Sequence, residues 1–329
     1  MRIVSPRTST FWWAAAVTAL LAIERPTPAS ANRIIVDQNA VATPGVFTSV
    51  QQAINDSGTV AGDEVFVRAG VYREAISLSK NITLACEGPH LVELRNDLGD
   101  TIVAAVGAIV TIKGCRITGS GNGIVLRQDC VATILNNVIV GNGVDGIASF
   151  RSSPKIGGSV MRNNVITSNS YGIHIDSARC GFNDPCCASV PSVTVENNIL
   201  YANRSRDRSI ECVSSVIVQY NNAIGNATNF YLPGKGSSEF SEDPSFVDPS
   251  RADFRLLATS TSRDRGNPTE PDPDGTRNDL GAFGGPDSWG FFPPLDGAGP
   301  SISAMSVEPN PVDKGGTVTL RATGRVNVQ

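Results

Sequence analysis

An asparagine-rich repeat over residues 110–231 constrains the fold of this 329-residue chain more than any other feature. Each unit contains an apolar stretch, a polar pair, an apolar pair and a later Asn, as in NNVITSNSYGIHI at residues 163–175. The second polar position recurs after 22, 27, 34 and 23 residues, at Cys115, Asn137, Asn164, Asn198 and Asn221. Such a unit is too short for a propeller blade of about 40 residues and lacks the periodicity of helical repeats. The repeat therefore predicts a β-solenoid, in which each coil adds short strands to parallel sheets.

The Asn residues fit the bends between these strands. Asn adopts left-handed backbone conformations more easily than most residues, and such conformations occur at sharp bends. Stacked from coil to coil, the amides can donate and accept hydrogen bonds along a column. We therefore interpret the Asn pairs as structural rather than catalytic.

A short helix is predicted before the coils, at residues 47–57. Its apolar residues fall on one helical face, which contains Phe47, Val50, Ala53 and Ile54. Thr48 and Gln51 have the spacing of a capping box. We expect this helix to cap the first coil, whose strands begin within residues 62–74 and 81–88.

Two of these stretches carry a resemblance to a known class of proteins. FTSVQQAINDS (47–57) and the sequence from GDEVFVRAGVYRE to NITLACEG (62–88) resemble the N-terminal part of bacterial right-handed parallel β-helix proteins of the pectin-lyase-like class. Residues 242–285 resemble the region that follows the coils in many secreted β-helix proteins. The resemblance covers residues 34–285 and implies an all-β, right-handed parallel β-helix with an N-terminal capping helix and a C-terminal extension. A shared fold does not by itself establish an activity.

The first 31 residues have the pattern of a secretory signal. Arg2 and Arg7 precede the apolar run FWWAAAVTALLAI, and the small residues of Ala29-Ser30-Ala31 follow it. The mature chain is then expected to begin at Asn32. No stretch reaches the roughly 20 apolar residues of a membrane-spanning helix, so we expect no transmembrane segment in the mature chain. The predicted location is secreted or at the cell surface.

The charge of the mature chain argues against a nucleic-acid partner. Removing three arginines and one glutamate with the signal changes the formal charge from −4 to −6, and an acidic protein is unsuited to a phosphate backbone. The expected partner is an extracellular or cell-surface glycan, bound by a monomer.

Seven cysteines in an exported chain predict up to three disulfides and one remaining thiol. Cys180, Cys186 and Cys187 lie in one short stretch, CGFNDPCC. Zinc binding is the alternative, but this stretch has no His and lacks paired C-x2-C spacing, so disulfides are favoured. Spacing alone does not determine which cysteines pair.

Composition divides the chain into five parts. A signal at 1–31 precedes a β-helix with its cap at 32–232, a β-helix-associated region at 233–285 and a linker rich in Pro and Gly at 286–300. Residues 301–329 resemble the opening strands of an immunoglobulin-like domain, which needs about 100 residues. These strands either dock on the preceding region or begin a truncated domain, and we favour truncation.

The strand after each later Asn suggests where chemistry takes place. Its apolar positions should face the interior in one column, formed by Ile124, Ile147, Ile173, Ile210 and Phe230. The neighbouring positions then point outward. They contain three candidate catalytic residues, His174, Asp176 and Glu211, and three candidate substrate-binding residues, Arg127, Phe150 and Tyr231.

These outward side chains suit a carbohydrate site. His or a carboxylate can transfer protons, Arg127 can neutralise a uronate, and Phe150 or Tyr231 can pack on a sugar ring. The simpler interpretation is a solvated sheet face on which His174 pairs with Glu211 across strands. The inserted residues 177–191 follow Asp176 directly and are expected to form one wall of a groove.

Two other charged stretches are weaker candidates. Asp272, Asp274 and Asp279 can be considered as Ca²⁺ ligands, but their stretch does not match the EF-hand loop, and a Pro/Gly turn explains it more simply. We therefore identify no cofactor, and a Ca²⁺ site is not supported. Arg204, Arg206 and Arg208 form a solvated loop or a contact for an acidic polysaccharide.

The sequence leaves two functions open. The resemblance implies a secreted polysaccharide lyase or glycoside hydrolase, and Asp176 with Glu211 can supply the two carboxylates that hydrolysis needs. However, the chain lacks the paired-Asp and Gly-His-Gly signatures of polygalacturonases, the metal-and-arginine strand signature of pectate lyases and the Gln-Asp motif of pectin methylesterases. The alternative is a non-catalytic module for adhesion, glycan binding or surface structure, which the immunoglobulin-like tail favours.

Overall fold

The computed structural model describes residues 31–40, 45–149, 158–175, 193–204, 216–226, 237–288, 301–308 and 319–325. The chain divides into two units, residues 1–31 and 32–329. The expected secretory signal lies outside the described residues, apart from Ala31. Among the described residues, no helix is both long and apolar enough to cross a membrane.

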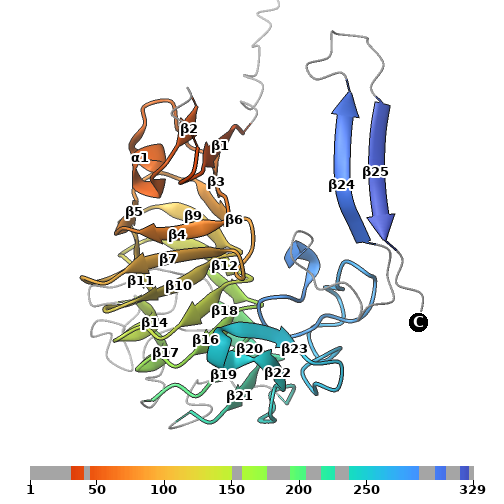
Figure 1. Ribbon diagram of the computed structural model, residues 1–329. Coiled ribbons are helices and arrows are strands. Elements are labelled where there is room, and N and C mark those ends of the chain that lie inside the picture. The colour runs from red at the N-terminus through yellow and green to blue at the C-terminus, as the bar shows by residue number, and fades with distance from the viewer. Residues whose placement is uncertain are drawn as a thin grey trace, which may run out of the picture. The chain divides into compact units, whose positions relative to one another are not determined.

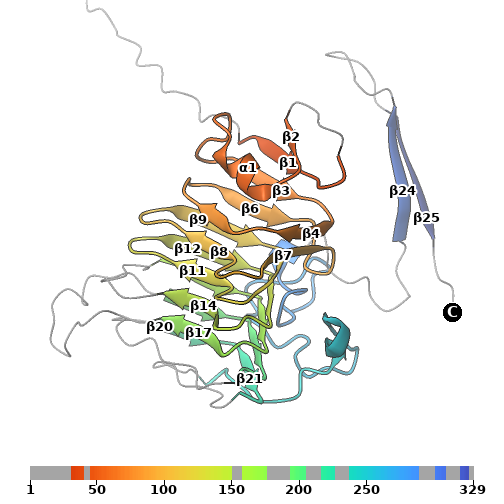
Figure 2. The same cartoon turned by 60° about the vertical axis from the view of Figure 1, so that its left-hand side comes forward.

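The second unit is built around three parallel sheets (Figures 1 and 2). In spatial order, sheet A contains β2 (Val46–Phe47), β1 (Arg33–Val36), β3 (Glu64–Val67), β6 (Thr83–Cys86), β9 (Ile109–Lys113), β12 (Val131–Leu135), β15 (Val160–Arg162), β18 (Val193–Glu196) and β20 (Val216–Gln219). Sheet B contains β4 (Gly70–Arg73), β7 (Val92–Asn96), β10 (Arg116–Gly119), β13 (Val138–Val140), β16 (Val165–Thr167), β19 (Ile199–Tyr201) and β21 (Asn222–Ile224). Sheet C contains β5 (Ile76–Leu78), β8 (Ile102–Ala104), β11 (Ile124–Leu126), β14 (Asp145–Ser149) and β17 (Tyr171–Ile175).

Each coil contributes one strand to each sheet in turn, which confirms the predicted parallel β-solenoid. Coil 1 consists of β3, β4 and β5, and the following coils repeat this order as far as coil 5, which ends at β17. Coils 6 and 7 contribute β18 with β19 and β20 with β21 within the described residues. Strands that are far apart in sequence therefore become neighbours at the sheet spacing of about 4.8 Å.

The core consists of inward-facing columns of β-branched and other apolar residues. On sheet C, one column stacks five buried isoleucines: Ile76, Ile102, Ile124, Ile147 and Ile173. The predicted stacking of the last three is therefore confirmed, whereas Ile210 and Phe230 lie outside the described residues. Strand alternation places every second side chain inside, and β-branched residues pack well on a pleated surface.

Two asparagine ladders run along the solenoid, as the repeat predicted. The first consists of Asn137, Asn164, Asn198 and Asn221, and the second of Asn142, Asn169, Asn203 and Asn226. Each Nδ2 donates to Oδ1 of the Asn in the next coil, at 3.0 Å for Asn164 to Asn198. The left-handed bend falls one residue before the first ladder, for example at Asn163 with φ 52°. The two members of an Asn pair therefore have different roles, one at the bend and one in the ladder.

The Gly that precedes the inward Ile in coils 3 and 4 is required by close packing between coils. A Cβ atom at Gly123 would lie 2.6 Å from the carbonyl oxygen of Gly146, and one at Gly146 would lie at the same distance from that of Gly172. Real Cβ atoms do not approach a backbone atom so closely. The repeated Gly-Ile pair therefore belongs to the fold rather than to a ligand site.

The N-terminal cap is shorter than expected and is fastened differently. Helix α1 covers only Val50–Asn55, and Ser49 rather than Thr48 is its N-cap residue. Glu74, from coil 1, accepts hydrogen bonds from Ser49 Oγ and from the backbone N–H groups of the first turn. Gln51 forms no capping box, because its side chain bonds to the backbone of Ser77 in β5. The Gln51 side chain thus pairs with backbone groups at the edge of sheet C, where a neighbouring strand would otherwise pair with them.

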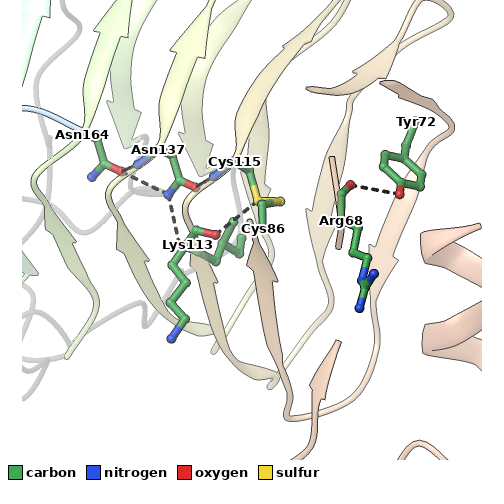
Figure 3. The surroundings of a disulfide bond; sticks show 8 residues. Arg68, Tyr72, Cys86, Lys113, Cys115, Asn137 and Asn164 are labelled. Carbon is green, nitrogen blue, oxygen red and sulfur yellow. Dashed lines mark hydrogen bonds between the residues drawn. A yellow bond between two sulfur atoms is a disulfide. The ribbon is translucent and has the colours of Figure 1, made fainter. Parts of the chain in front are cut away.

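A disulfide joins adjacent coils at the start of the first ladder (Figure 3). Cys86 ends β6 and Cys115 occupies the ladder position one coil before Asn137, whose Oδ1 accepts from the Cys115 backbone N–H. Cys130 is a buried thiol, and burial raises its pKa to about 11. The remaining four cysteines lie outside the described residues, so their predicted pairing stays a prediction.

The residues after the coils, 237–288, form what we call the C-terminal segment. It contains the antiparallel pair β22 (Phe246–Asp248) and β23 (Asp253–Leu256) and the 3-10 turns Pro249–Arg251 and Pro286–Ser288. Apolar residues of the segment pack on the outer face of sheet B in one cluster, which contains Val138, Val165, Ile199, Phe246, Phe254, Leu280, Ala282 and Phe283. Figure 1 shows β22 and β23 beside the strands of the later coils.

Asn side chains at or just after the bends hold the C-terminal segment against several coils. Asn222 of coil 7 donates to Glu242 O, Asn163 of coil 5 to Asp279 O, and Asn136 of coil 4 to Gly284 O. The segment therefore runs back along the solenoid from its last coil.

The final described strands form an antiparallel hairpin, β24 (Ser301–Glu308) with β25 (Thr319–Arg325). It falls where the sequence resembles an immunoglobulin-like domain, and that assignment stays a prediction. The expected linker at 286–300 is described only as far as Ser288.

Candidate functional site

The connections between the end of sheet C and the start of sheet A, at one corner of the coils, differ in length from coil to coil. In coils 1–3 this connection has four residues, at 79–82, 105–108 and 127–130. In coils 4 and 5 it lengthens to ten residues at 150–159 and seventeen at 176–192. We call this the C–A corner. Inserted connections on one side of a solenoid commonly form its binding surface. The C–A corner is therefore the candidate binding surface of this protein.

His174 lies near this corner, one residue before the end of β17, and its partner is Asp145. The imidazole Nδ1 is 2.9 Å from Asp145 Oδ2, with 13% of the His174 side chain and 1% of the Asp145 side chain exposed. The ring of Tyr171 lies 5.6 Å from the imidazole. Sequence reasoning proposed Glu211 as the partner, but Glu211 lies outside the described residues.

Asp145 belongs to a third polar column, which sequence analysis missed. Asn122 Nδ2 donates to Asp100 Oδ1 at 2.7 Å, and the Asp145 backbone N–H donates to Asn122 Oδ1 at 3.0 Å. The chain of contacts therefore runs through four successive coils, from Asp100 to His174. The available signal was the match of VDGIAS around Asp145 with GNGIVL around Asn122.

The side chain of Asp145 does more than continue this column. Its link to Asn122 uses the backbone N–H, which any residue except proline supplies. Its Oδ2 contacts His174, and within the described part of the chain Oδ1 has no hydrogen-bond partner. Burying a carboxylate is costly unless it is paired, so the contact with the imidazole stabilises both groups.

The arrangement is chemically competent for proton transfer. An ionised Asp145 accepts a hydrogen bond from Nδ1–H of His174 and so selects one tautomer of the ring. A carboxylate that orients an imidazole in this way is a common support for a general acid or base. Asp145 is itself too buried to reach a large substrate, which makes it a positioning residue.

Arg127 is exposed and lies at the same corner as His174. It follows β11, whose Leu126 pairs with Ser149, and Ser149 pairs with Ile175 next to His174. Arg127 is therefore two coils from the end of β17, or about 10 Å at two strand spacings. Four other predicted site residues lie outside the described residues: Phe150, Asp176, Glu211 and Tyr231.

One expectation about this face was wrong. The predicted outward column of Val125, Ala148 and His174 has the expected register, but it is not a solvated face. Val125 is 2% exposed and Ala148 is fully buried. Small and apolar side chains at these positions allow close packing over the sheet, so His174 stands at the boundary of a covered surface.

The aspartates that were considered as Ca²⁺ ligands form hydrogen bonds within their own loops. Asp272 accepts hydrogen bonds from the backbone N–H groups of Asp279 and Gly285, and Asp279 accepts one from Asp264. Burial raises the pKa of Asp272 to about 7 and that of Asp279 to about 6. Within the described ranges, no three His, Cys, Asp or Glu residues are grouped as metal ligands would be.

The predicted arginine-rich contact is only partly described. Arg204 is exposed and donates to Ser168 O, whereas Arg206 and Arg208 lie outside the described residues. This stretch therefore stays a candidate contact rather than an observed one.

Comparison with known proteins places these features in a family. The model of the family described as "Right handed beta helix region" matches residues 62–184 and 102–243, which together span more than half of the chain. A protein of Methanothermus fervidus named "Cell surface glycoprotein" is 34% identical over 104 residues, which are 32% of this chain and 17% of that protein. The chain thus matches only a small part of that relative's length. On the fold and the family match together, the chain belongs to the right-handed β-helix family.

Proposed function

We propose that this protein acts at the cell surface or outside the cell, where it binds an extracellular polysaccharide at the C–A corner. One observation carries the proposal: the connections at this corner lengthen from four to seventeen residues beside His174. Short turns suffice to close a coil, as they do in coils 1–3. The extra residues are therefore best explained by contact with a ligand.

The proposed location is supported by the relative and the family. The M. fervidus protein is named as a glycoprotein of the cell surface. An extended β-helix stabilised by ladders and a disulfide suits an exported protein. We further assign the chain to the pectin-lyase-like class on the basis of the residues that resemble its N-terminal part.

Arg127 and His174 indicate the chemical class of the polysaccharide that would bind at the C–A corner. A polymer that lies along the solenoid axis meets successive coils in steps of about 4.8 Å. Arg127 is exposed and lies two coils from the end of β17, so both residues can contact one chain of a few sugar units. A guanidinium favours carboxylate groups, which points to a uronate-containing polysaccharide.

Cleavage of the bound polysaccharide is the second candidate, and the His174–Asp145 pair favours it. The pair suits a lyase, in which a base removes the proton next to a uronate carboxyl group and an acid protonates the leaving oxygen. Hydrolysis needs two accessible carboxylates, and Asp145 is too buried to be one of them. The proposed catalytic residues remain His174, Asp176 and Glu211, with Asp145 as the positioning residue.

The test combines binding and turnover on the purified protein. Affinity for acidic and neutral polysaccharides is measured by calorimetry, and cleavage is followed through new reducing ends and through the absorbance of unsaturated uronates. We expect Arg127→Gln to weaken binding of an acidic polysaccharide about tenfold, or about 1.4 kcal/mol. Arg73→Gln, at an exposed arginine on the outer face of sheet B, is the matched control and should change little.

The outcomes separate the candidates. Equal effects of the two arginine variants would contradict binding at the C–A corner. Binding without turnover would leave a glycan-binding module, and unsaturated products that are lost in His174→Gln would establish a lyase. If folded protein binds none of the polysaccharides, the structural or adhesive module becomes the better interpretation.

A further inference from the structure

Four tripeptides in the chain have the Asn-x-Ser/Thr pattern of acceptors for N-linked glycans. They begin at Asn55, Asn81, Asn203 and Asn226. An acceptor asparagine needs an accessible side-chain amide, and the folded protein must accommodate a bulky glycan there. The structure separates the four residues by these two requirements.

Asn203 and Asn226 are unsuitable because both belong to the second ladder. Asn203 is buried, and its Nδ2 donates to Ile166 O and to Asn226 Oδ1. Asn226 Nδ2 donates to Leu200 O at 2.8 Å. A side-chain amide has only two hydrogens, and N-glycosylation replaces one of them. A glycan on Asn203 would therefore break the ladder and force a polar sugar between packed coils, and a glycan on Asn226 would remove a hydrogen that bonds to Leu200 O or Ile224 O.

Asn81 meets both requirements. It is exposed in the four-residue connection between β5 and β6. Its Oδ1 accepts the backbone N–H of Ile109 at 2.9 Å, which orients the carboxamide with its oxygen toward the next coil. The nitrogen then lies on the other side of the planar group. Thr83 supplies the required hydroxyl residue and lies on the outer face of sheet A.

Asn55 lies at the same end of the solenoid. It is the last residue of α1 and is exposed, and its Oδ1 accepts from Gln51 Nε2. Lys80, next to Asn81, donates to the carbonyl oxygen of Asp56, next to Asn55. This bond holds the two candidate acceptors near each other on the N-terminal cap.

We propose that Asn81 and Asn55 are acceptor sites for N-linked glycans and that the ladder residues are not. The donor is a lipid-linked oligosaccharide pyrophosphate. The amide nitrogen forms a bond to C1 of the first sugar, the bond from C1 to the pyrophosphate oxygen breaks, and the nitrogen loses one proton. The lipid pyrophosphate is the leaving group. This inference does not depend on the proposed binding of polysaccharide at the C–A corner.

The full chain is tested by secretion from a eukaryotic host that carries out N-glycosylation. Removal of the glycans by peptide N-glycosidase in ¹⁸O-labelled water converts each modified Asn to labelled Asp, which peptide mass spectrometry locates. We expect label at Asn81 and Asn55 in the folded, secreted protein, and none at Asn203 or Asn226. Circular dichroism and a cooperative thermal transition establish that the protein is folded.

Matched variants remove one acceptor at a time without changing the asparagine. Thr83→Val keeps a β-branched residue on sheet A and should eliminate the glycan at Asn81 only, whereas Ser57→Ala should eliminate the glycan at Asn55 only. An unlabelled Asn81 or Asn55 in the folded wild-type protein overturns the assignment for that residue. Label at Asn203 or Asn226 in folded protein overturns the exclusion of the ladder.

Discussion

The imidazole of His174 lies 2.9 Å from the buried carboxylate of Asp145, although the two residues are 29 positions apart in the chain. The contact joins coil 5 to coil 4, because His174, next to the end of β17, reaches the first residue of β14. It is the part of the described structure that most directly suggests chemistry.

Replacing Asp145 by Asn should separate positioning from folding. Asp145→Asn keeps the backbone bond to Asn122, so the protein should fold, but it removes the charge beside His174. On a polysaccharide that the protein cleaves, we expect turnover to fall about 100-fold or more, with little change in binding affinity. Asp100→Asn, in the same polar column but two coils from Asp145, is the control. Equal losses in both variants would contradict a positioning role.

A charge in the first ladder should strongly destabilise the fold. In Asn198→Asp, a carboxylate oxygen replaces the Nδ2 that donates to Asn221 Oδ1 and Met161 O. Buried acceptors then face each other, and we expect the free energy of unfolding to fall by about 3 kcal/mol or more. Urea denaturation measures the change. Asn39→Asp, at an exposed turn, should have almost no effect.

Loosening the C-terminal segment should expose sheet B of the later coils. Phe254 is buried in the cluster with Val165 and Ile199, and Phe254→Ala should cost about 3–5 kcal/mol. We expect hydrogen exchange, followed by mass spectrometry, to accelerate in β13, β16 and β19. Val247→Ala, at a neighbouring residue that is 43% exposed, provides the control. Unchanged exchange in these strands would show that the segment does not protect them.

The C-terminal segment should be more stable at mildly acidic pH. Burial raises the pKa of Asp272 from 3.8 to about 7, so the folded state binds its proton more tightly than the unfolded state does. The stabilising contribution is complete below pH 4 and is lost as the pH rises through about 7. Chemical denaturation between pH 4 and 8 should show this decrease. It should become smaller in Asp272→Asn, although Asp279, with a pKa raised to about 6, still contributes.

The disulfide and the first ladder should be partly interchangeable. Cys86→Ala with Cys115→Ala removes the bond between two coils, and we expect a loss of about 3 kcal/mol. Cys86→Ala with Cys115→Asn places an amide next to Asn137 and extends the ladder by one residue. This second variant should recover about 1 kcal/mol of the loss in thermal or urea unfolding. Identical stability of the two double variants would mean that a ladder cannot form at this position.

Regular features of the repeat made the β-solenoid predictable. Strand alternation is local, so the inward positions of Ile124, Ile147 and Ile173 follow from the sequence around each residue. The Asn pairs were equally readable, because each coil must bend sharply and the amides at equivalent positions must meet. The start of helix α1 was less predictable, because its first turn is held by Glu74 and Ser77 of coil 1.

The coils, their inward columns and the asparagine ladders follow from the amino-acid sequence alone, because they depend on short-range alternation and on a repeat near 22 residues. The contact between Asp145 and His174 and the return of residues 237–288 over sheet B are visible only in the folded chain. Such contacts depend on how coils of unequal length stack and where a following segment can bury its apolar side chains. Neither is encoded in any single stretch, because each contact joins residues that only the stacking of coils or the return of the segment brings together.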